Sequence, residues 1–221
     1  MIDQLIIGNI ASYDDFEASV KTRTIKDGAK KEIKESVPFS NVTHDFSAIN
    51  GEVYWNEKEL KYVFEITANT PEELEEKKIS FKSWVMNVAE EKLYDPYIRD
   101  YHFIATFKGI DADDSEIEKS TITVTFTAYP YMLSNQKRLY TVQLAASKEV
   151  VLTVYNNSSH RITPTFNSDV AFPVKIGGSS YGVPVGETTD DSFKLAAGLN
   201  TLTLKATASG TLNISFCEEV F

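Results

Sequence analysis

Histidine and cysteine side chains are the first places to look for catalysis or metal binding in this sequence. His44, His102 and His160 lie far apart, and Cys217 is the single cysteine. None of them stands at the spacing of a zinc site. On a predicted strand His102 shares a face with Ile104, so we expect an ordinary sheet histidine. One cysteine excludes an internal disulfide framework, and we expect a buried thiol near a strand end.

Acidic residues between 111 and 122 have the composition, but not the order, of a calcium-binding loop. Asp111, Asp113, Asp114 and Glu116 follow one another closely. The sixth position of such a loop must be glycine, because the chain turns sharply there, and the twelfth is a bidentate glutamate. Those positions hold Glu116 and Ile122, so we expect no calcium site.

Asp95 has the most unusual surroundings of the acidic residues, because it stands between two tyrosines and beside a proline. In the segment Tyr94-Asp95-Pro96-Tyr97 its carboxylate could contact a partner or a substrate. It could equally cap the turn that this segment forms, which is ordinary chemistry for aspartate. We favour the turn cap.

Other patterns that could support catalysis are incomplete. Glu90-Glu91 and Asp190-Asp191 are paired carboxylates, but a glycosidase needs two carboxyl groups that converge across the substrate. The segment 177–180, Gly-Gly-Ser-Ser, lacks the lysine and the helix that complete a phosphate-binding loop. We therefore predict a protein that is not an enzyme, with no catalytic, metal-binding or cofactor-binding residues.

The stretch 70–133 has the clearest structural pattern, and it positions these candidates. Thr70-Pro71 predicts a helix start, because threonine caps the first free amides and proline fits the first turn; Glu73 stands where a capping box reaches back. Apolar residues then recur at helical spacing, which predicts one apolar stripe on a helix that runs to about Glu91. They are Leu74, Phe81, Trp84, Val85 and Val88. Two strands with one apolar face each follow, on Tyr101, Phe103, Ala105 and Phe107, then on Ile122, Val124, Phe126 and Ala128.

Charge divides the chain into two parts. The sequence has 22 Lys+Arg and 32 Asp+Glu residues and a net charge of −10. Residues 136–221 contain 7 of each sign, so 15 basic and 25 acidic residues remain in 1–135, which carries the whole excess. A nucleic-acid grip needs clustered lysine and arginine, so this balance argues against one. The change of composition marks a domain boundary near residue 135.

Residues 136–221 predict short strands and no helix. Apolar residues alternate over 150–154, 172–176, 202–204 and 212–216, with turn-forming segments between these ranges. About eight short strands with frequent turns are typical of an all-β sandwich of the jelly-roll or galectin-like kind. The predicted fold is therefore an α+β domain of antiparallel sheets and one helix at 1–135, followed by an all-β sandwich domain at 136–221.

The first 60 residues predict smaller elements. A first strand is expected at 4–7, ending at Gly8-Asn9. Residues 21–36 alternate basic and polar side chains around the turn signal Asp27-Gly28, which suits a two-stranded arm or a long surface loop. Such a charged segment is usually a solvated face, and an interaction tongue is the alternative. Asn50-Gly51 is the favoured sequence of a two-residue hairpin turn.

Several of these segments, in their order, resemble the distal tail protein (Dit) family of long-tailed phages. The resemblance rests on the helix with Trp84, the loop Leu93-Tyr94-Asp95-Pro96-Tyr97 and the strand end Phe126-Thr127-Ala128-Tyr129-Pro130-Tyr131. Upstream, Asp45-Phe46-Ser47, Gly51 and Leu60-Lys61-Tyr62-Val63-Phe64 fit the lead-in of that family. The resemblance covers roughly residues 1–135.

This resemblance implies a structural protein without catalysis. The first domain would be tail-tube-like and form a hexameric ring, with the sandwich outside it. The ring would join the tail tube protein to the tail-tip or baseplate hub protein, and DNA would pass through its channel without specific binding. The protein would reside at the distal tail tip of the virion after assembly in the host cytoplasm.

The first residues and the hydropathy of the chain agree with assembly in the host cytoplasm. Met1-Ile2-Asp3-Gln4 lacks the basic region and apolar run of a signal peptide, and no apolar stretch approaches the length of a membrane span. We therefore expect folding in a reducing compartment and no membrane contact.

A carbohydrate-binding β-sandwich involved in host-surface adsorption is the alternative function, and an enzyme of unrecognised type comes third. Sugar sites usually stack the sugar on exposed aromatic rings. Trp55 and Trp84 both lie in the first domain, which leaves mainly Tyr140, Tyr155 and Tyr181 for such a role in the sandwich.

Overall fold

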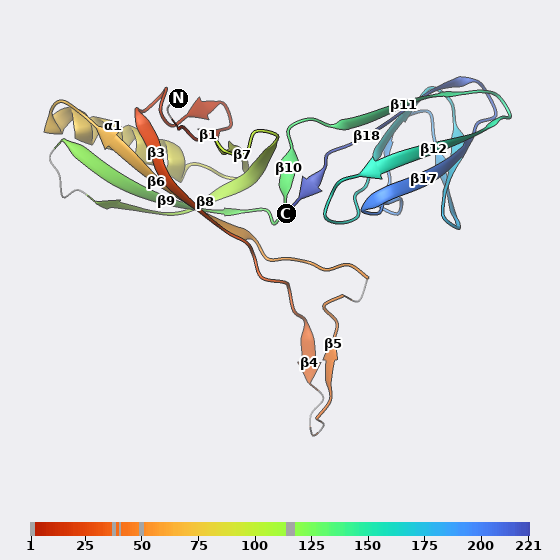
Figure 1. Cartoon of the computed structure of the whole chain (residues 1–221), viewed down its shortest axis with the longest axis horizontal. Helices are drawn as coiled ribbons and strands as arrows, with labels where there is room; N and C mark the ends of the chain where they lie inside the picture. The colour runs from red at the N-terminus through yellow and green to blue at the C-terminus, as the bar shows by residue number, and fades with distance from the viewer. Residues whose placement is uncertain (1–2, 37–38, 40, 49–50, 114–117) are drawn as a thin grey trace. The chain divides into compact units, whose positions relative to one another are not determined.

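The computed structural model describes residues 3–36, 39, 41–48, 51–113 and 118–221. They consist mostly of antiparallel β-strands with one α-helix, and they divide into two compact units, 1–132 and 133–221 (Figure 1). Each unit has its own hydrophobic core. Within the described residues no helix has both the length and the apolar character needed to cross a membrane.

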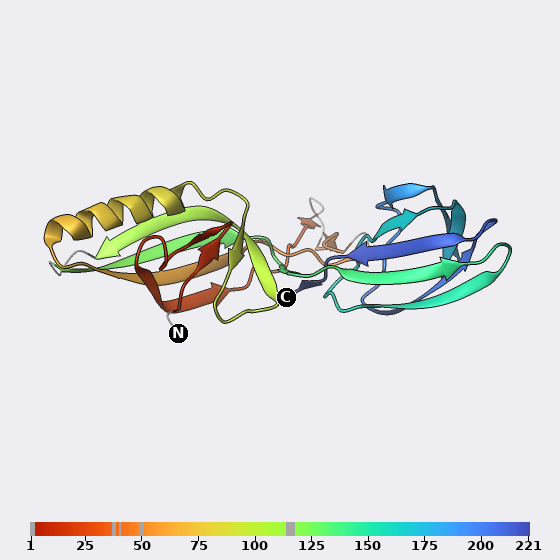
Figure 2. The same ribbon diagram turned by 90° about the horizontal axis from the view of Figure 1, so that it is seen from above.

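The first unit is built on one antiparallel sheet, here called the large sheet, in the strand order β2-β1-β7-β8-β9-β6-β3. Its strands are β1 Ile6–Ile7, β2 Ile10–Ala11, β3 Ala18–Lys26, β6 Lys58–Thr67, β7 Glu91–Tyr94, β8 Tyr101–Asp113 and β9 Lys119–Ala128. The alternation predicted for β6, β8 and β9 is present. On β9, for example, Ile122, Val124, Phe126 and Ala128 are buried. Helix α1, Pro71–Met86, lies along the face of the sheet to which they point (Figure 2).

The predicted start of α1 is correct, and its predicted end is wrong. The Thr70 hydroxyl accepts the Glu73 amide at 3.2 Å, as a cap should, although the Glu73 carboxylate reaches back to the amide of Asn69 instead of Thr70. The helix ends at Met86. The side-chain amide of Asn87 caps this end by donating a hydrogen bond to the Ser83 carbonyl at 2.7 Å. The chain then turns into β7.

The helical spacing of apolar residues predicts the wrong end for α1, because the last residue of the pattern packs in the sheet. Val88 continues the apolar spacing of the helix and is only 6% exposed. Its carbonyl, however, accepts a hydrogen bond from the Phe107 amide of β8, so this carbonyl is bonded to the sheet. Glu90, at φ 52°, then bends the chain just before β7. The sequence did not predict β7, because the predicted helix extends to Glu91, which is the first residue of that strand. The loop predicted around Asp95 does follow β7.

Two other predicted elements differ from the structure. The first strand is shorter than 4–7, because β1 starts at Ile6, and the Gly8-Asn9 turn leads to β2, which the sequence did not indicate. The acidic connection predicted from Asp111 begins later, since Asp111 and Asp113 belong to β8. Residues 49–50 and 114–117 lie outside the described residues, and with them the hairpin predicted at Asn50-Gly51 and part of the acidic loop.

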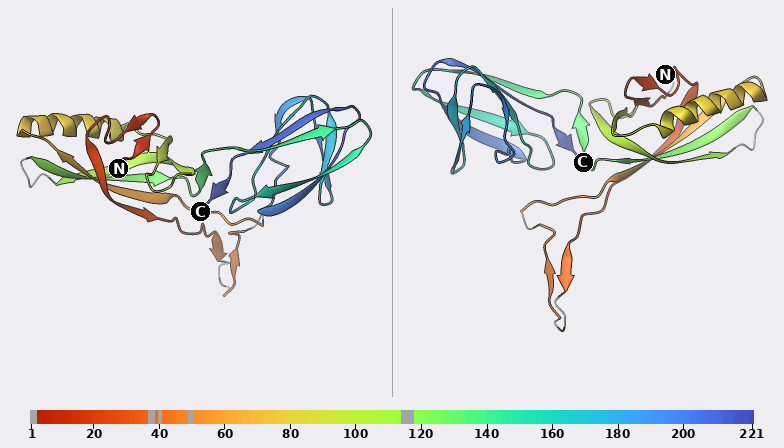
Figure 3. Two further views of the ribbon diagram at one scale, coloured as in Figure 1. Left: turned by 45° about the horizontal axis from the view of Figure 1, so that its top comes forward. Right: turned by 180° about the vertical axis from the view of Figure 1, so that it is seen from behind.

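An arm extends beyond β3 and β6, and it contains β4 Lys34–Ser36 and β5 Thr43–Asp45 (Figures 1 and 3). The two strands pair antiparallel, with Glu35 opposite His44. The predicted two-stranded arm is therefore present, but residues 21–26 are part of β3 and belong to the large sheet.

The second unit contains eight strands in two antiparallel four-stranded sheets, β11-β18-β13-β16 and β12-β17-β14-β15. Both contribute to one core that includes Phe166, Phe193 and Leu204. The bounds are β11 Arg138–Leu144, β12 Glu149–Asn156, β13 Thr165–Ser168, β14 Phe172–Ile176, β15 Ser179–Val183, β16 Gly186–Thr189, β17 Gly198–Lys205 and β18 Gly210–Phe216. The short strands β10 Met132–Ser134 and β19 Glu219–Val220 pair with each other.

Candidate interaction surface

The histidines that the sequence offered for chemistry lie on separate elements. His44 is on the exposed β5, His102 is buried on β8 against the Tyr94 ring at 5.3 Å, and His160 follows β12, 3.2 Å from a Glu219 carboxylate oxygen. Among the residues that the structure describes, no three His, Cys, Asp or Glu side chains form a group that could hold a metal ion.

Cys217 is half-buried near the end of β18, and its thiol donates to the Ser134 carbonyl at 3.1 Å. This environment is the one expected for a structural thiol at a strand end.

Asp95 is the predicted site residue with the richest surroundings. Its carboxylate is buried in the loop after β7 and accepts the Tyr97 amide at 2.8 Å, which is the turn cap that the sequence favoured. The same carboxylate accepts the Tyr62 hydroxyl at 2.8 Å and forms an ion pair with Arg23. The Arg23 guanidinium lies 4.7 Å over the Tyr97 ring. Asp95 therefore connects β3, β6 and the loop between β7 and β8.

The electrostatics of this cluster keep Tyr62 in its donor form. Burial and the neighbouring Asp95 charge raise the pKa of the Tyr62 phenol far above its usual range. A hydrogen bond to Asp3 raises the pKa of Tyr97 as well. No local pattern in the sequence indicates this cluster, because Arg23 and Tyr62 lie 72 and 33 residues from Asp95. We interpret the cluster as a structural tie between elements.

The arm carries more exposed apolar surface than a solvated loop needs. Its legs are joined near the base by hydrogen bonds from Asn56 to Ala29 and from Lys31 to Tyr54. Among its described residues, six large apolar side chains are at least 40% exposed, namely Ile33, Phe39, Val42, Phe46, Val53 and Tyr54. Apolar side chains gathered on one projecting element mark a surface that another protein covers. This favours the interaction tongue over the solvated face.

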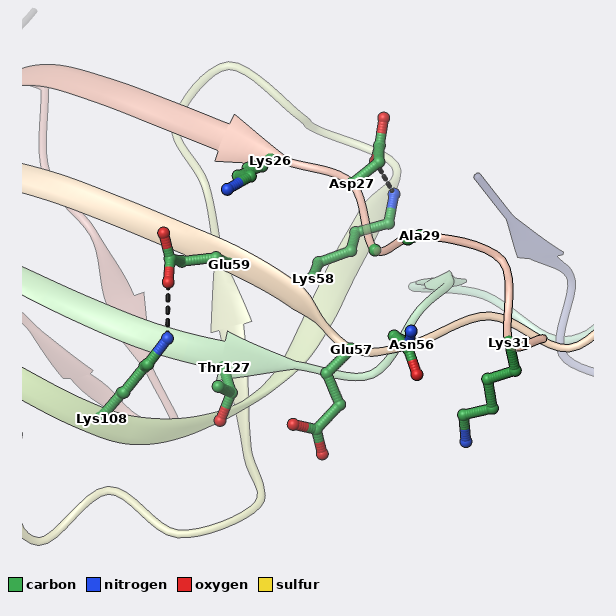
Figure 4. A pocket seen from close by; sticks show the side chains of 11 residues that line it. Lys26, Asp27, Ala29, Lys31, Asn56, Glu57, Lys58, Glu59, Lys108 and Thr127 are labelled. Carbon is green, nitrogen blue, oxygen red and sulfur yellow. Dashed lines mark hydrogen bonds and ion pairs between the residues drawn. The ribbon is translucent and has the colours of Figure 1, made fainter. Parts of the chain in front are cut away.

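A polar groove of about 580 Å³ lies at the base of the arm. Four lysines and three carboxylates line it, and two of the ion pairs join Lys58 to Asp27 at 2.8 Å and Lys108 to Glu59 at 2.6 Å (Figure 4). The Lys58 side chain is only 2% exposed, so its pair with Asp27 is held against the body of the sheet. The groove is open and carries both signs of charge, with one more lysine than carboxylates, and we interpret it as the anchor of the arm.

Gly28 sets the spacing of the two arm legs. A Cβ atom at this position would lie 1.9 Å from the Asn56 carbonyl oxygen and 2.7 Å from that of Glu57. Only a residue without a side chain allows this approach. The Asp27-Gly28 turn signal located the position, but the reason for the glycine is its contact with the returning leg.

The sandwich tyrosines offer little free ring surface for a sugar. The Tyr140 hydroxyl accepts the Tyr155 amide at 3.0 Å, and the Tyr140 ring packs on Phe216. Tyr181 packs edge-on against Phe193 at 4.9 Å, whereas Tyr155 is half-exposed. The carbohydrate alternative therefore gains no support from the packing of these rings.

A search of solved structures relates this arrangement to phage tail proteins. The crystal structure of the Dit protein of phage SPP1 aligns with 98% of this chain and 99% of its own, at a TM-score of 0.71 and 12% sequence identity. The chain has the fold of SPP1 Dit. That protein is presented as a paradigm of the hub adsorption apparatus in Gram-positive infecting phages. A chain in the structure of the phage P2 baseplate, in its activated conformation with Ca, also aligns. The alignment covers 97% of this chain and 98% of the baseplate chain, with 9% identity and a TM-score of 0.46.

Comparison by sequence gives no such relative. Neither the protein-family models nor the curated proteins yield a match. The resemblance to the Dit family that the motifs indicated is thus confirmed by the fold, over nearly the full length of the chain.

Proposed function

We propose that this protein is a structural component of a phage tail, a hub at the distal end of the tail tube, and that it has no catalytic activity. The observation that carries the proposal is the shared fold with SPP1 Dit over 98% of the chain. Residues 1–135 would form the ring domain and residues 136–221, as a galectin-like sandwich, the outer domain. The tail tube protein and a baseplate or tail-tip hub protein would be its neighbours in the virion, after assembly in the host cytoplasm.

The proposed ring contains six copies around a channel for DNA. Two features of the first unit support contact between copies. The arm exposes apolar side chains that another surface could bury. Strand β3 stands last in the order of the large sheet, and edge strands are ready templates for pairing with another chain. A rotationally symmetric ring uses such a heterologous contact repeatedly until it closes.

Mass in solution and electron microscopy test this assembly. Light scattering should give ~149 kDa, six times the chain mass of 24.8 kDa, and negative-stain images should show rings. Ile33→Asp, which changes an arm residue that is 56% exposed, should prevent ring formation without unfolding the chain. Val185→Asp, at a sandwich residue that is 63% exposed, is the matched control and should leave rings intact. A wild-type chain that stays monomeric at high concentration, even with its tube neighbour, would contradict the proposal.

A further inference from the structure

The face of the large sheet opposite α1 has an unusual side-chain composition. Alternate residues of β9 point away from the helix, and these are Thr121, Thr123, Thr125 and Thr127. Their partners on β6, and the β3 residues that pair with those in turn, continue the same surface, because directly paired residues of antiparallel strands share a face. Thr24, for example, is paired to Lys61, which is paired to Thr125. We call this surface the threonine face.

The threonine face also carries lysines, and two glutamates of β6 hold three of them. Glu65 lies 2.6 Å from the ammonium groups of both Lys21 and Lys119. Glu59 lies 2.6 Å from Lys108. Figure 4 shows this pair, with Glu59 reaching across from β6 to the lysine on β8.

The protonation states of the two glutamates reflect these contacts. Hydrogen bonds from Lys119 and Lys21 lower the pKa of Glu65, and the hydrogen bond from Lys108, with Lys26 and Lys61 nearby, lowers the pKa of Glu59. Both carboxylates are therefore fully charged near neutral pH.

Asp111 and Asp113 of β8 add two negative charges, since they pair with Thr123 and Thr121 and so share the face. Five lysines thus meet four carboxylates among hydroxyl groups that carry no charge. The lysines on this face are 21, 26, 61, 108 and 119.

The ion pairs on the face weaken its attraction for a polyanion. A lysine that reaches a phosphate releases condensed counterions, and this release is the main source of non-specific DNA affinity. A lysine already bound to a glutamate must break that ion pair before it can bind a phosphate, so the gain is largely cancelled. Threonine hydroxyls offer a neutral, hydrated surface in between.

We propose that the threonine face is the surface past which duplex DNA moves, and that Glu59 and Glu65 prevent its lysines from holding the phosphate backbone. This inference rests on the proposed tail function. It assigns the low DNA affinity to the ion pairs that Glu59 and Glu65 form with three lysines of one sheet face, in addition to the acidic charge of the whole chain.

Duplex binding by a charge-altered protein tests the inference. The variant Glu59→Gln with Glu65→Gln keeps the shape of both side chains and removes the glutamate partners of Lys21, Lys108 and Lys119. A gel shift or fluorescence anisotropy titration should show no binding of a random duplex by the wild type at 50 mM salt. The double variant should bind, and three phosphate contacts predict an affinity that falls about 40-fold between 50 and 200 mM salt.

The matched control makes the same change in net charge elsewhere. Glu32→Gln with Glu75→Gln also removes two negative charges and two lysine partners, on the arm and on α1. It should not bind DNA. Equal binding by both double variants would show that net charge alone decides, and would overturn the inference. So would a Glu59/Glu65 variant that binds no better than wild type while circular dichroism shows it folded. Ring formation is measured separately, so either result leaves the proposed hub function to its own test.

Discussion

Replacing Asp95 by alanine should show how strongly one buried carboxylate ties the first unit together. The change removes the acceptor of the Tyr62 hydroxyl and the ion-pair partner of Arg23. The Tyr62 side chain is fully buried, whereas the Arg23 side chain is 30% exposed and can take water as a substitute partner. The larger cost should therefore come from the stranded hydroxyl.

The expected magnitude follows from these two exposures. A buried hydroxyl without an acceptor costs about 1–3 kcal/mol. The ion pair, screened by solvent at Arg23, contributes about 1 kcal/mol, well below a fully buried pair. Asp95→Ala should thus lower the free energy of unfolding by about 3 kcal/mol. Tyr62→Phe, which leaves Asp95 its other donors, should cost about 1 kcal/mol.

A double-mutant cycle isolates the contribution of the hydroxyl. In the Tyr62→Phe background no buried hydroxyl is stranded, so Asp95→Ala should cost about 1–2 kcal/mol less than in the wild type. Urea unfolding followed by tryptophan fluorescence is the suitable assay, because Trp55 and Trp84 both lie in the first unit. Costs that simply add, to within about 0.5 kcal/mol, would refute the assignment of the Tyr62–Asp95 hydrogen bond as a buried, coupled contact.

Three further predictions concern the arm, the helix and acid. Gly28→Ala should destabilise the first unit by about 1–3 kcal/mol, since its Cβ would overlap the returning leg. Gly109→Ala, also in the first unit but with nothing within 4 Å of its Cβ position, is the control in the same urea assay. Trp84→Ala should cost about 2 kcal/mol by circular dichroism, below the range for a fully buried ring, because Trp84 is half-buried and stacks on Phe16. Glu65 has a folded pKa below its ordinary 4.5, so its stabilisation is complete above that pH and lost as the pH falls further. Accordingly, the urea midpoint should stay level from pH 7 to about 5, and a Glu65→Gln variant should lose less below that range.

The sequence alone determined those elements whose signals are local. The start of α1 depends on Thr70 and Pro71, which act within one turn, and it was predicted correctly. The strands β6, β8 and β9 each alternate apolar and polar residues, so their buried faces follow from the period of two. Recognition of the tail-protein fold also came from the order of such local segments, which the solved structure of SPP1 Dit confirms.

Contacts between distant residues were decided only by the tertiary structure. Trp84 illustrates this, because helical spacing predicts that it belongs to the apolar stripe, whereas only the tertiary structure stacks its ring at 4.9 Å on Phe16. The helix end is a second case. Val88 satisfies helical spacing and sheet packing equally, and the bond from its carbonyl to Phe107 settles the choice.

The candidate surfaces depend even more on chain topology. Alternation predicted that Ile122, Val124, Phe126 and Ala128 share a face, but the pairing of β9 with β6 decides that two glutamates lie beside the threonines of the opposite face. Local rules described Asp95 as a turn cap, and the sheet order then brought Arg23 and Tyr62 to it from 72 and 33 residues away. The physical reason is the same in both cases. Burial period and capping act over a few residues, whereas ion pairs and buried hydrogen bonds form between whichever side chains the strand order places together.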